Sequence, residues 1–68
     1  MASVDMKLKE LLGIPEAVEI LERHIPGMTT NRQLKMAMSM TFRSMSKFPQ
    51  ANIPDELLEQ IDTELQAL

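Results

Sequence analysis

Cysteine, tryptophan and tyrosine are absent from this chain of 68 residues, and Phe42 and Phe48 are its only aromatic residues. Without cysteine the chain can form no disulfide, no thiol nucleophile and no cysteine-based zinc site. Without tryptophan and tyrosine it has few aromatic surfaces on which nucleic-acid bases could stack. The core must therefore be built from aliphatic residues and methionine, of which there are seven.

Long apolar runs are absent too, since none approaches the ~20 residues that a membrane-spanning helix needs. Residues 1–5 also lack the basic and then apolar order of a secretion signal. We therefore expect a cytoplasmic protein that does not contact a membrane. A chain this short supports a single domain, residues 1–68, with residues 1–4 disordered. It also has no interior to spare for a ligand cavity of about 300 Å³ or more.

Proline and glycine are few, and they divide the chain into helical segments. Pro15 and Pro54 each fit the first position of a helix, where the missing N–H needs no partner. Asp5 and Thr41 fit the N-cap position that precedes a helix. No segment alternates apolar and polar residues as a half-buried strand does. The expected helices cover residues 6–12, 15–25, 31–39, 42–48 and 54–68.

These segments predict an all-α fold, a compact orthogonal bundle of four or five helices. The count stays open because residues 31–48 fit two helices or one bent helix. Residues 6–11 and 40–45 also resemble each other, and each stretch precedes an Ile-Pro-acid motif. One interpretation is a unit of a short and a long helix that is used twice, and chance matching is the other. Apolar spacing predicts a core of Leu8, Leu11, Leu12, Val18, Leu21, Ile25, Leu34, Phe42, Met45, Ile61 and Leu65.

Sets of residues with the spacing of a catalytic or metal site are not found in this sequence. His24 is the single histidine, so a metal site or a nucleophile–base pair has no second imidazole and no thiol to use. Its place near the end of a helix predicts a surface histidine that the helix dipole favours. The carboxylates lie on the polar faces of the expected helices. This placement indicates solvated side chains rather than two carboxyl groups that face each other across a cleft, as glycoside hydrolysis needs. We therefore expect no enzyme activity, no cofactor and no metal.

The charges are segregated along the chain. No Asp or Glu occurs between Glu22 and Asp55, whereas the last expected helix has five acidic residues and no base. This distribution favours pairing between the basic middle and the acidic helices, within the domain or across a dimer. A small regulator that binds nucleic acid through the basic middle is the alternative. The net charge of −3 and the lack of stacking aromatics count against it. The bases of the middle are Arg23, Arg32, Lys35, Arg43 and Lys47.

Methionine is concentrated in the same basic middle. Met36, Met38 and Met40 stand at alternate positions, and on a helix these positions cannot all point the same way. At least one of them should therefore reach the surface, where methionine suits adaptable binding, and packing in the core is the other interpretation. We expect a protein partner, either a second copy in a homodimer or a parent enzyme. The expected partner-binding residues are Met36, Met38, Met40, Arg43 and Lys47.

The order of five motifs resembles that of a known family. The motifs are residues 8–12 (LKELL), 17–28 (AVEILERHIPGM), 40–45 (MTFRSM), 48–49 (FP) and 57–61 (LLEQI). This order is similar to that of a small helical module at the C-terminal end of bacterial glycoside hydrolases, notably the family 3 β-glucosidases of clostridia and their relatives. It also resembles a compact bacterial helical domain whose members often carry a Cys-x-x-Cys pair, which this chain lacks. The resemblance implies a non-catalytic accessory domain appended to a larger enzyme.

Overall fold

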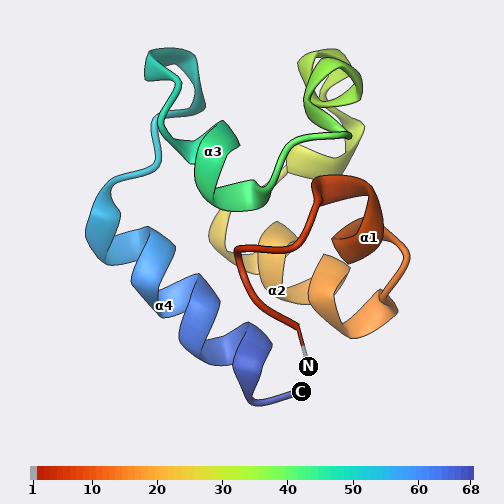
Figure 1. The fold of residues 1–68 in the computed structure, drawn as a ribbon, viewed down its shortest axis with the longest axis vertical. Coiled ribbons are helices and arrows are strands. Elements are labelled where there is room, and N and C mark those ends of the chain that lie inside the picture. Colours follow the sequence, from red (N-terminus) through yellow and green to blue (C-terminus); the bar gives the residue numbers. More distant parts are fainter. Residues whose placement is uncertain (1) are drawn as a thin grey trace.

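The computed structural model describes residues 2–68, apart from the side chains of Gln33 and Gln50. Within this part of the chain every regular element is a helix, so the expectation of an all-α domain is confirmed. The α-helices are α1 (Leu8–Leu12), α2 (Pro15–His24), α3 (Phe42–Ser46) and α4 (Asp55–Gln66) (Figure 1). The 3-10 helices are η1 (Met28–Thr30), η2 (Arg32–Ala37) and η3 (Pro49–Ala51). In residues 2–68 no helix has the length and apolar character that crossing a bilayer requires.

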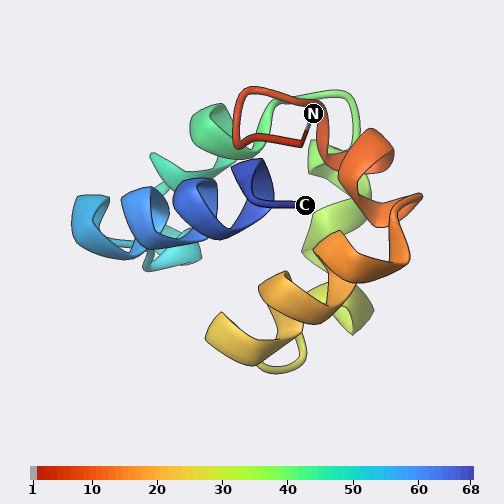
Figure 2. The same cartoon turned by 90° about the horizontal axis from the view of Figure 1, so that it is seen from below.

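The two longer helices, α2 and α4, pack against each other, and α1 packs against α2. A proline marks the start of both longer helices, but only Pro15 occupies the first helical position that the sequence predicts. Pro15 is the first residue of α2, and Pro54 is the N-cap of α4. The N-terminal segment, drawn in red, crosses the molecule on the side opposite α2 (Figure 2). It therefore covers the core from the side that the long helices leave open.

Residues 32–37 form a 3-10 helix, whereas the sequence predicts an α-helix over residues 31–39. A 3-10 helix turns more tightly, with three residues a turn and hydrogen bonds to the third residue back. The bond from the Leu34 N–H to the carbonyl of Asn31, at 3.1 Å, has this spacing. The chain then leaves the helix, and α3 begins separately at Phe42. This part of the chain thus contains two separate helices, one of the two alternatives that the sequence leaves open.

The first N–H groups of α1 find their hydrogen-bond acceptors in a distant part of the chain. Leu8 and Lys9 donate backbone N–H groups to the carbonyls of Met40 (2.8 Å) and Met38 (3.1 Å). The first N–H groups of any helix lack partners within that helix, and burying them without one costs free energy. The segment before α3 therefore completes the start of α1.

The start of α3 is completed in the same way by the segment before α1. Phe42 and Arg43 donate backbone N–H groups to the carbonyls of Met6 (3.1 Å) and Val4 (2.9 Å). The donors Phe42 and Arg43 lie 34 residues after the donors Leu8 and Lys9. The acceptors Met6 and Val4 lie 34 residues before the acceptors Met40 and Met38. The two short helices thus hold each other's first turns.

The two N-cap predictions have different outcomes. Thr41 is the N-cap of α3 as predicted, and its hydroxyl oxygen accepts a hydrogen bond from the Ser44 N–H at 3.1 Å. The N-cap of α1 is Lys7 rather than Asp5, and the Glu10 carboxylate accepts the Lys7 N–H at 3.1 Å. Asp5 stands two residues further back, where its carboxylate pairs with an arginine of α3.

The core lies between α2, α4 and the two short helices. Its largest fully buried side chains are those of Phe42, Leu8, Leu11, Leu21, Ile61, Leu65 and Val4. Among the residues that the sequence predicts for the core, Leu12, Val18 and Ile25 are only half-buried, and all the others are buried. Ala17 and Ile20 are buried on α2 in place of Val18. The buried face of α2 is therefore turned toward Ala17 and Ile20 relative to the predicted one.

The N-terminal segment belongs to the core, although the sequence predicts disorder for residues 1–4. Val4 is fully buried, and Ala2 is 6% exposed. The backbone of Val4 is bound at both polar groups, since its N–H donates to Oδ1 of Asp62 at 3.0 Å and its carbonyl accepts the Arg43 N–H. The prediction is therefore wrong for this segment except at its first residue, which lies outside the described part of the chain.

Ile61 lies at the centre of the apolar stripe of α4 and has no exposed surface, so Ile61→Ala should leave a cavity in the core. We expect this substitution to lower the free energy of unfolding by about 2–5 kcal/mol, a large part of a small domain's stability. Leu68→Ala is the control, because Leu68 is 52% exposed and should cost less than about 0.5 kcal/mol. Chemical denaturation followed by circular dichroism measures both losses. Equal losses at the two positions would contradict this description of the core.

Candidate functional site

A groove opens between residues 25–37 and residues 45–53, and the 3-10 helices η2 and η3 of these two segments project at the upper end of the molecule in Figure 1. Its volume is about 370 Å³. Among the described residues that line it, no side chain is charged and only that of Asn31 is polar. The lining residues are Ile25, Pro26, Gly27, Met28, Asn31, Leu34, Met36, Ala37, Met45, Phe48, Ala51 and Ile53.

The sequence predicts no cavity of this size, because the interior of so short a chain is too small for one. That prediction concerns the interior, and the groove does not lie there. It lies between two segments that diverge above the core, while the core below stays filled by side chains such as Phe42 and Leu21. Its volume is within the range of small-molecule and cofactor pockets, which starts near 300 Å³.

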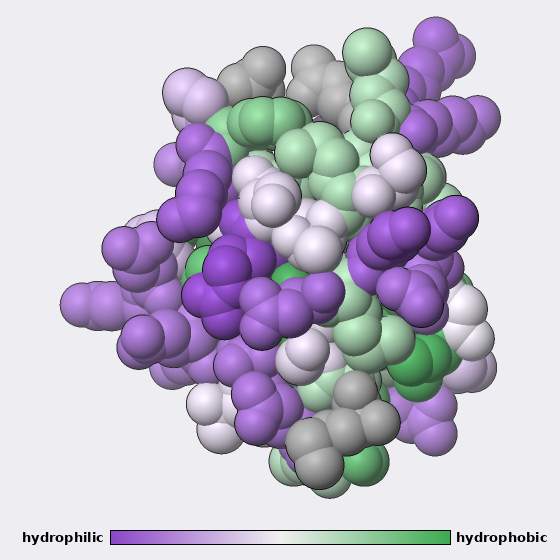
Figure 3. All heavy atoms as spheres, viewed as in Figure 1, coloured by the Kyte–Doolittle hydropathy of each residue, from purple (hydrophilic) through white to green (hydrophobic). Residues whose placement is uncertain are grey.

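Two large apolar side chains stand exposed at this groove. Met36 on η2 is 87% exposed, and Phe48, just before η3, is 44% exposed. The other exposed large apolar side chain in residues 2–68 is Leu68, which does not line the groove. The space-filling view shows apolar surface across this end of the molecule, with hydrophilic side chains on either side (Figure 3). Apolar groups that converge on a groove are typical of binding sites rather than of scattered surface residues.

One wall of the groove depends on a glycine and a carboxylate. Gly27 has a φ of 82°, in the left-handed region that other residues rarely adopt, and it turns the chain from α2 into η1. The Glu22 carboxylate accepts hydrogen bonds from the Gly27 N–H (3.1 Å), the Thr29 N–H (2.8 Å) and the Thr29 hydroxyl (2.7 Å). The bonds from the Thr29 N–H, its hydroxyl and the Gly27 N–H lower the pKa of Glu22, because they stabilise its charged form. This role is not visible in the helical pattern, where Glu22 looks like one more residue of a solvated face.

Three basic residues belong to the two segments that form the walls, although none of them lines the groove itself. Arg32 and Lys35 stand three residues apart on η2, so they share one side of this 3-10 helix. Lys47 precedes Phe48 on the other wall. Arg32, Lys35 and Lys47 are exposed, and none of them forms an ion pair with a described residue; we call these three residues the basic rim. Residues 23–54, which include both walls, contain no Asp or Glu, so no acid of either wall offsets the rim.

The methionines of the predicted partner-binding site have different surroundings. Met36 is exposed at the groove. Met38 and Met40 are half-buried against the core, and their carbonyls are bound by α1. Met45, which lies outside the predicted site, is buried and lines the groove. Of the three alternating methionines, Met36 is therefore the one most accessible to a partner.

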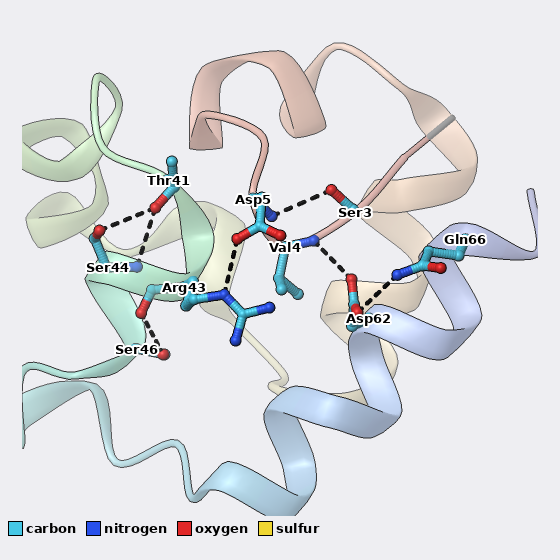
Figure 4. Close-up of polar contacts among 9 residues, drawn as sticks. All are labelled: Ser3, Val4, Asp5, Thr41, Arg43, Ser44, Ser46, Asp62 and Gln66. Carbon is cyan, nitrogen blue, oxygen red and sulfur yellow. Dashed lines mark hydrogen bonds and ion pairs between the residues drawn. The ribbon is translucent and has the colours of Figure 1, made fainter.

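Arg43, another predicted partner-binding residue, is paired within the domain. Its Nε donates to Oδ1 of Asp5 at 2.8 Å (Figure 4). This hydrogen bond, reinforced by the opposite charges, lowers the pKa of the Asp5 carboxyl and raises the pKa of Arg43. Figure 4 also shows Asp62 of α4 bound to the N–H of Val4. Arg43 therefore ties the N-terminal segment to α3, and it does not line the groove.

A second polar cluster joins α2 to α4. Nη1 of Arg23 lies 2.9 Å from Oε1 of Glu64, and Nε2 of His24 contacts the other oxygen of the same carboxylate. The His24 side chain is 19% exposed, so it is half-buried against α4 and is not the surface histidine that the sequence predicts. In residues 2–68, no group of three or more His, Asp or Glu side chains is placed to hold a metal. The polar clusters thus connect elements of the fold and lie apart from the groove.

Comparison of the chain with models of protein families, with curated proteins and with solved structures finds no match. The resemblance to an appended module of glycoside hydrolases therefore stays a prediction from the order of the motifs. The features of the molecule that bear on function are the groove, the exposed apolar side chains at its walls and the basic rim.

Glu22 makes the stability of the groove wall that contains Gly27 depend on pH. Because the pKa of folded Glu22 is below its ordinary value, its contribution to stability is complete above about pH 4.3 and is lost as the pH falls through the lower, folded-state pKa. We expect Glu22→Gln to lower stability at neutral pH and to reduce the loss at acid pH. Glu19→Gln, on the exposed face of the same helix, is the control and should leave the pH profile unchanged. Urea midpoints measured from about pH 7 down to about pH 2 test this. An unaltered acid profile in Glu22→Gln would contradict it.

Proposed function

We propose that this domain is a non-catalytic protein-association module whose groove receives apolar side chains of a partner polypeptide. The observation that carries the proposal is the exposure of Met36 and Phe48 on the two walls of an apolar groove. Methionine is flexible and polarisable, so it adapts to different partner side chains, and both residue types are enriched at interfaces. A partner that covers them removes apolar surface from water, which favours the complex.

Apolar burial supplies most of the affinity in this proposal. Burying one Leu-sized side chain contributes about 2 kcal/mol, which is roughly a 30-fold change in Kd. An exposed ion pair at the basic rim contributes at most about 1 kcal/mol. The rim charges therefore act mainly on the choice of partner and on the association rate.

The chemistry of the lining favours binding over catalysis. General acid–base catalysis needs a titratable side chain within hydrogen-bond reach of the substrate, and covalent catalysis needs an activated nucleophile. The described lining residues supply neither group. The paired titratable groups, such as Glu64 with His24, join α2 to α4 outside the groove.

The proposal includes the setting that the sequence predicts, an accessory domain of a larger cytoplasmic enzyme of a bacterium, related to glycoside hydrolases. It also includes the finer description of the fold, an orthogonal bundle made from a short-helix and long-helix unit used twice. The reciprocal hydrogen bonds between the first turns of α1 and α3 support the repeat, because each bond has a counterpart at the equivalent position of the other unit.

A selection from a random-peptide display library tests the proposed function. Peptides of about 16 residues, long enough for four helical turns, are selected for binding to the chain. We expect the enriched peptides to contain two or more bulky apolar residues. We expect their Kd to rise at least about tenfold in the double variant Met36→Ser/Phe48→Ser, because the variant removes the exposed apolar contacts of both walls.

Leu68→Ser is the matched control, since it removes an exposed apolar side chain outside the groove. It should leave each Kd unchanged. All three substitutions replace exposed side chains, so the unfolding curves of the variants should match that of the parent chain. The proposal fails if no peptide is enriched, or if the enriched peptides bind the double variant as tightly as the parent chain.

A further inference from the structure

We infer that the partner segment is acidic, with bulky apolar side chains set among Asp and Glu residues. This inference rests on the proposed function and specifies the chemistry of the polypeptide that the groove receives. It follows from the charges around the groove, from the state of the basic side chains there and from the polarity of the lining.

Within the two segments that form the walls, the charges are of one sign. Both walls belong to residues 23–54, which contain no acid. Glu22 and Asp55 adjoin the two ends of that stretch. The Glu22 carboxylate is bound by the N–H groups and the hydroxyl of the loop at residues 27–29, and Asp55 lies in the first turn of α4. A negatively charged segment in the groove therefore meets cations on both walls, whereas a positively charged segment is repelled.

The basic rim is also available, unlike other bases of the same stretch. Arg23 pairs with Glu64, and Arg43 pairs with Asp5, so these two arginines serve the fold. Arg32, Lys35 and Lys47 are exposed and form no ion pair with a described residue. Within residues 23–54, the fold thus pairs Arg23 and Arg43 and leaves the three bases of the rim for a partner.

A second copy of the chain fits the groove poorly, although its α4 is acidic. Of the apolar residues of α4, Leu58 is 5% exposed, Ile61 and Leu65 are fully buried in their own core, and Leu57 is half-buried against that core. The outer face of α4 is polar, so it offers charge without side chains that could enter the groove. The acidic partner segment therefore belongs to a surface or tail whose apolar side chains are not already buried.

Nucleic acid is a weaker match than an acidic polypeptide. It would satisfy the cations of the rim, but its phosphates would gain nothing from a lining without charged side chains. Phe48 is the one aromatic residue at the groove, which gives at most one position for a base to stack. An acidic segment with apolar side chains matches the rim and the lining together.

The test uses the same display library with two forms of the chain. One is the parent chain, and the other is the charge-reversed variant Arg32→Glu/Lys35→Glu/Lys47→Glu. We expect the parent chain to enrich peptides with a net negative charge and the reversed variant to enrich peptides with a net positive charge. The control is Lys7→Glu/Lys9→Glu, which reverses two exposed bases outside the groove and should still enrich acidic peptides.

The best peptide from the parent chain is then remade with every Asp and Glu replaced by Asn and Gln, and again by Lys, with its apolar residues kept. Fluorescence anisotropy should give a Kd at least about tenfold higher for the amide form and a further rise for the Lys form, with the preference inverted in the charge-reversed variant. The difference between the acidic and amide forms should shrink at high salt, because exposed charges are screened.

Each alternative outcome has a separate meaning. If the peptides depend on Met36 and Phe48 but bind equally with acidic, amide or Lys residues, the groove binds polypeptides and the inference about charge is wrong. If the enriched peptides do not depend on Met36 and Phe48, the proposed function itself fails. Duplex DNA that displaces the acidic peptide with similar affinity, or a doubled solution mass that the charge reversal abolishes, would replace the acidic segment with nucleic acid or with a second copy.

Discussion

Four backbone hydrogen bonds between residues 4–9 and residues 38–43 hold the first turns of α1 and α3 against each other. Each bond satisfies an N–H group that helix geometry leaves without an internal acceptor. Helices of five residues are not stable alone in water, so both depend on contacts made elsewhere in the chain. Their donors and acceptors are far apart in the sequence, and the two starts therefore form together as the domain folds.

The position of the groove follows from these four hydrogen bonds between residues 4–9 and residues 38–43, the junction of α1 and α3. The carbonyls of Met38 and Met40 are bound by α1, and their side chains pack against the core. The preceding helix, η2, stands beyond the junction on one side with Met36 exposed, and α3 leads away toward Phe48 and η3 on the other. The groove is the space between η2 and the segment from α3 to η3. Buried residues such as Met45 belong both to its lining and to the core.

Local signals were sufficient to predict much of the fold. Pro15 and Pro54 mark the starts of the two long helices, Thr41 caps α3, and the stripe of α4 identifies Ile61 as buried. Burial of the N-terminal segment was not predictable, because it depends on acceptors and donors in α3 and α4 that are distant in sequence. The alternating methionines indicate that at least one reaches the surface, but only the junction with α1 determines that it is Met36.

The candidate site was predictable to a smaller extent than the fold. Segregation of charge in the sequence indicates a basic region, but the pairing of Arg43 with Asp5 and of Arg23 with Glu64 decides which bases remain unpaired in the wall segments.

NMR mapping of a bound, display-selected peptide tests the central claim most directly. The account predicts that backbone amide shifts concentrate in residues 25–37 and 45–53. Shifts concentrated on the outer face of α4, or at the junction of α1 and α3, would contradict it.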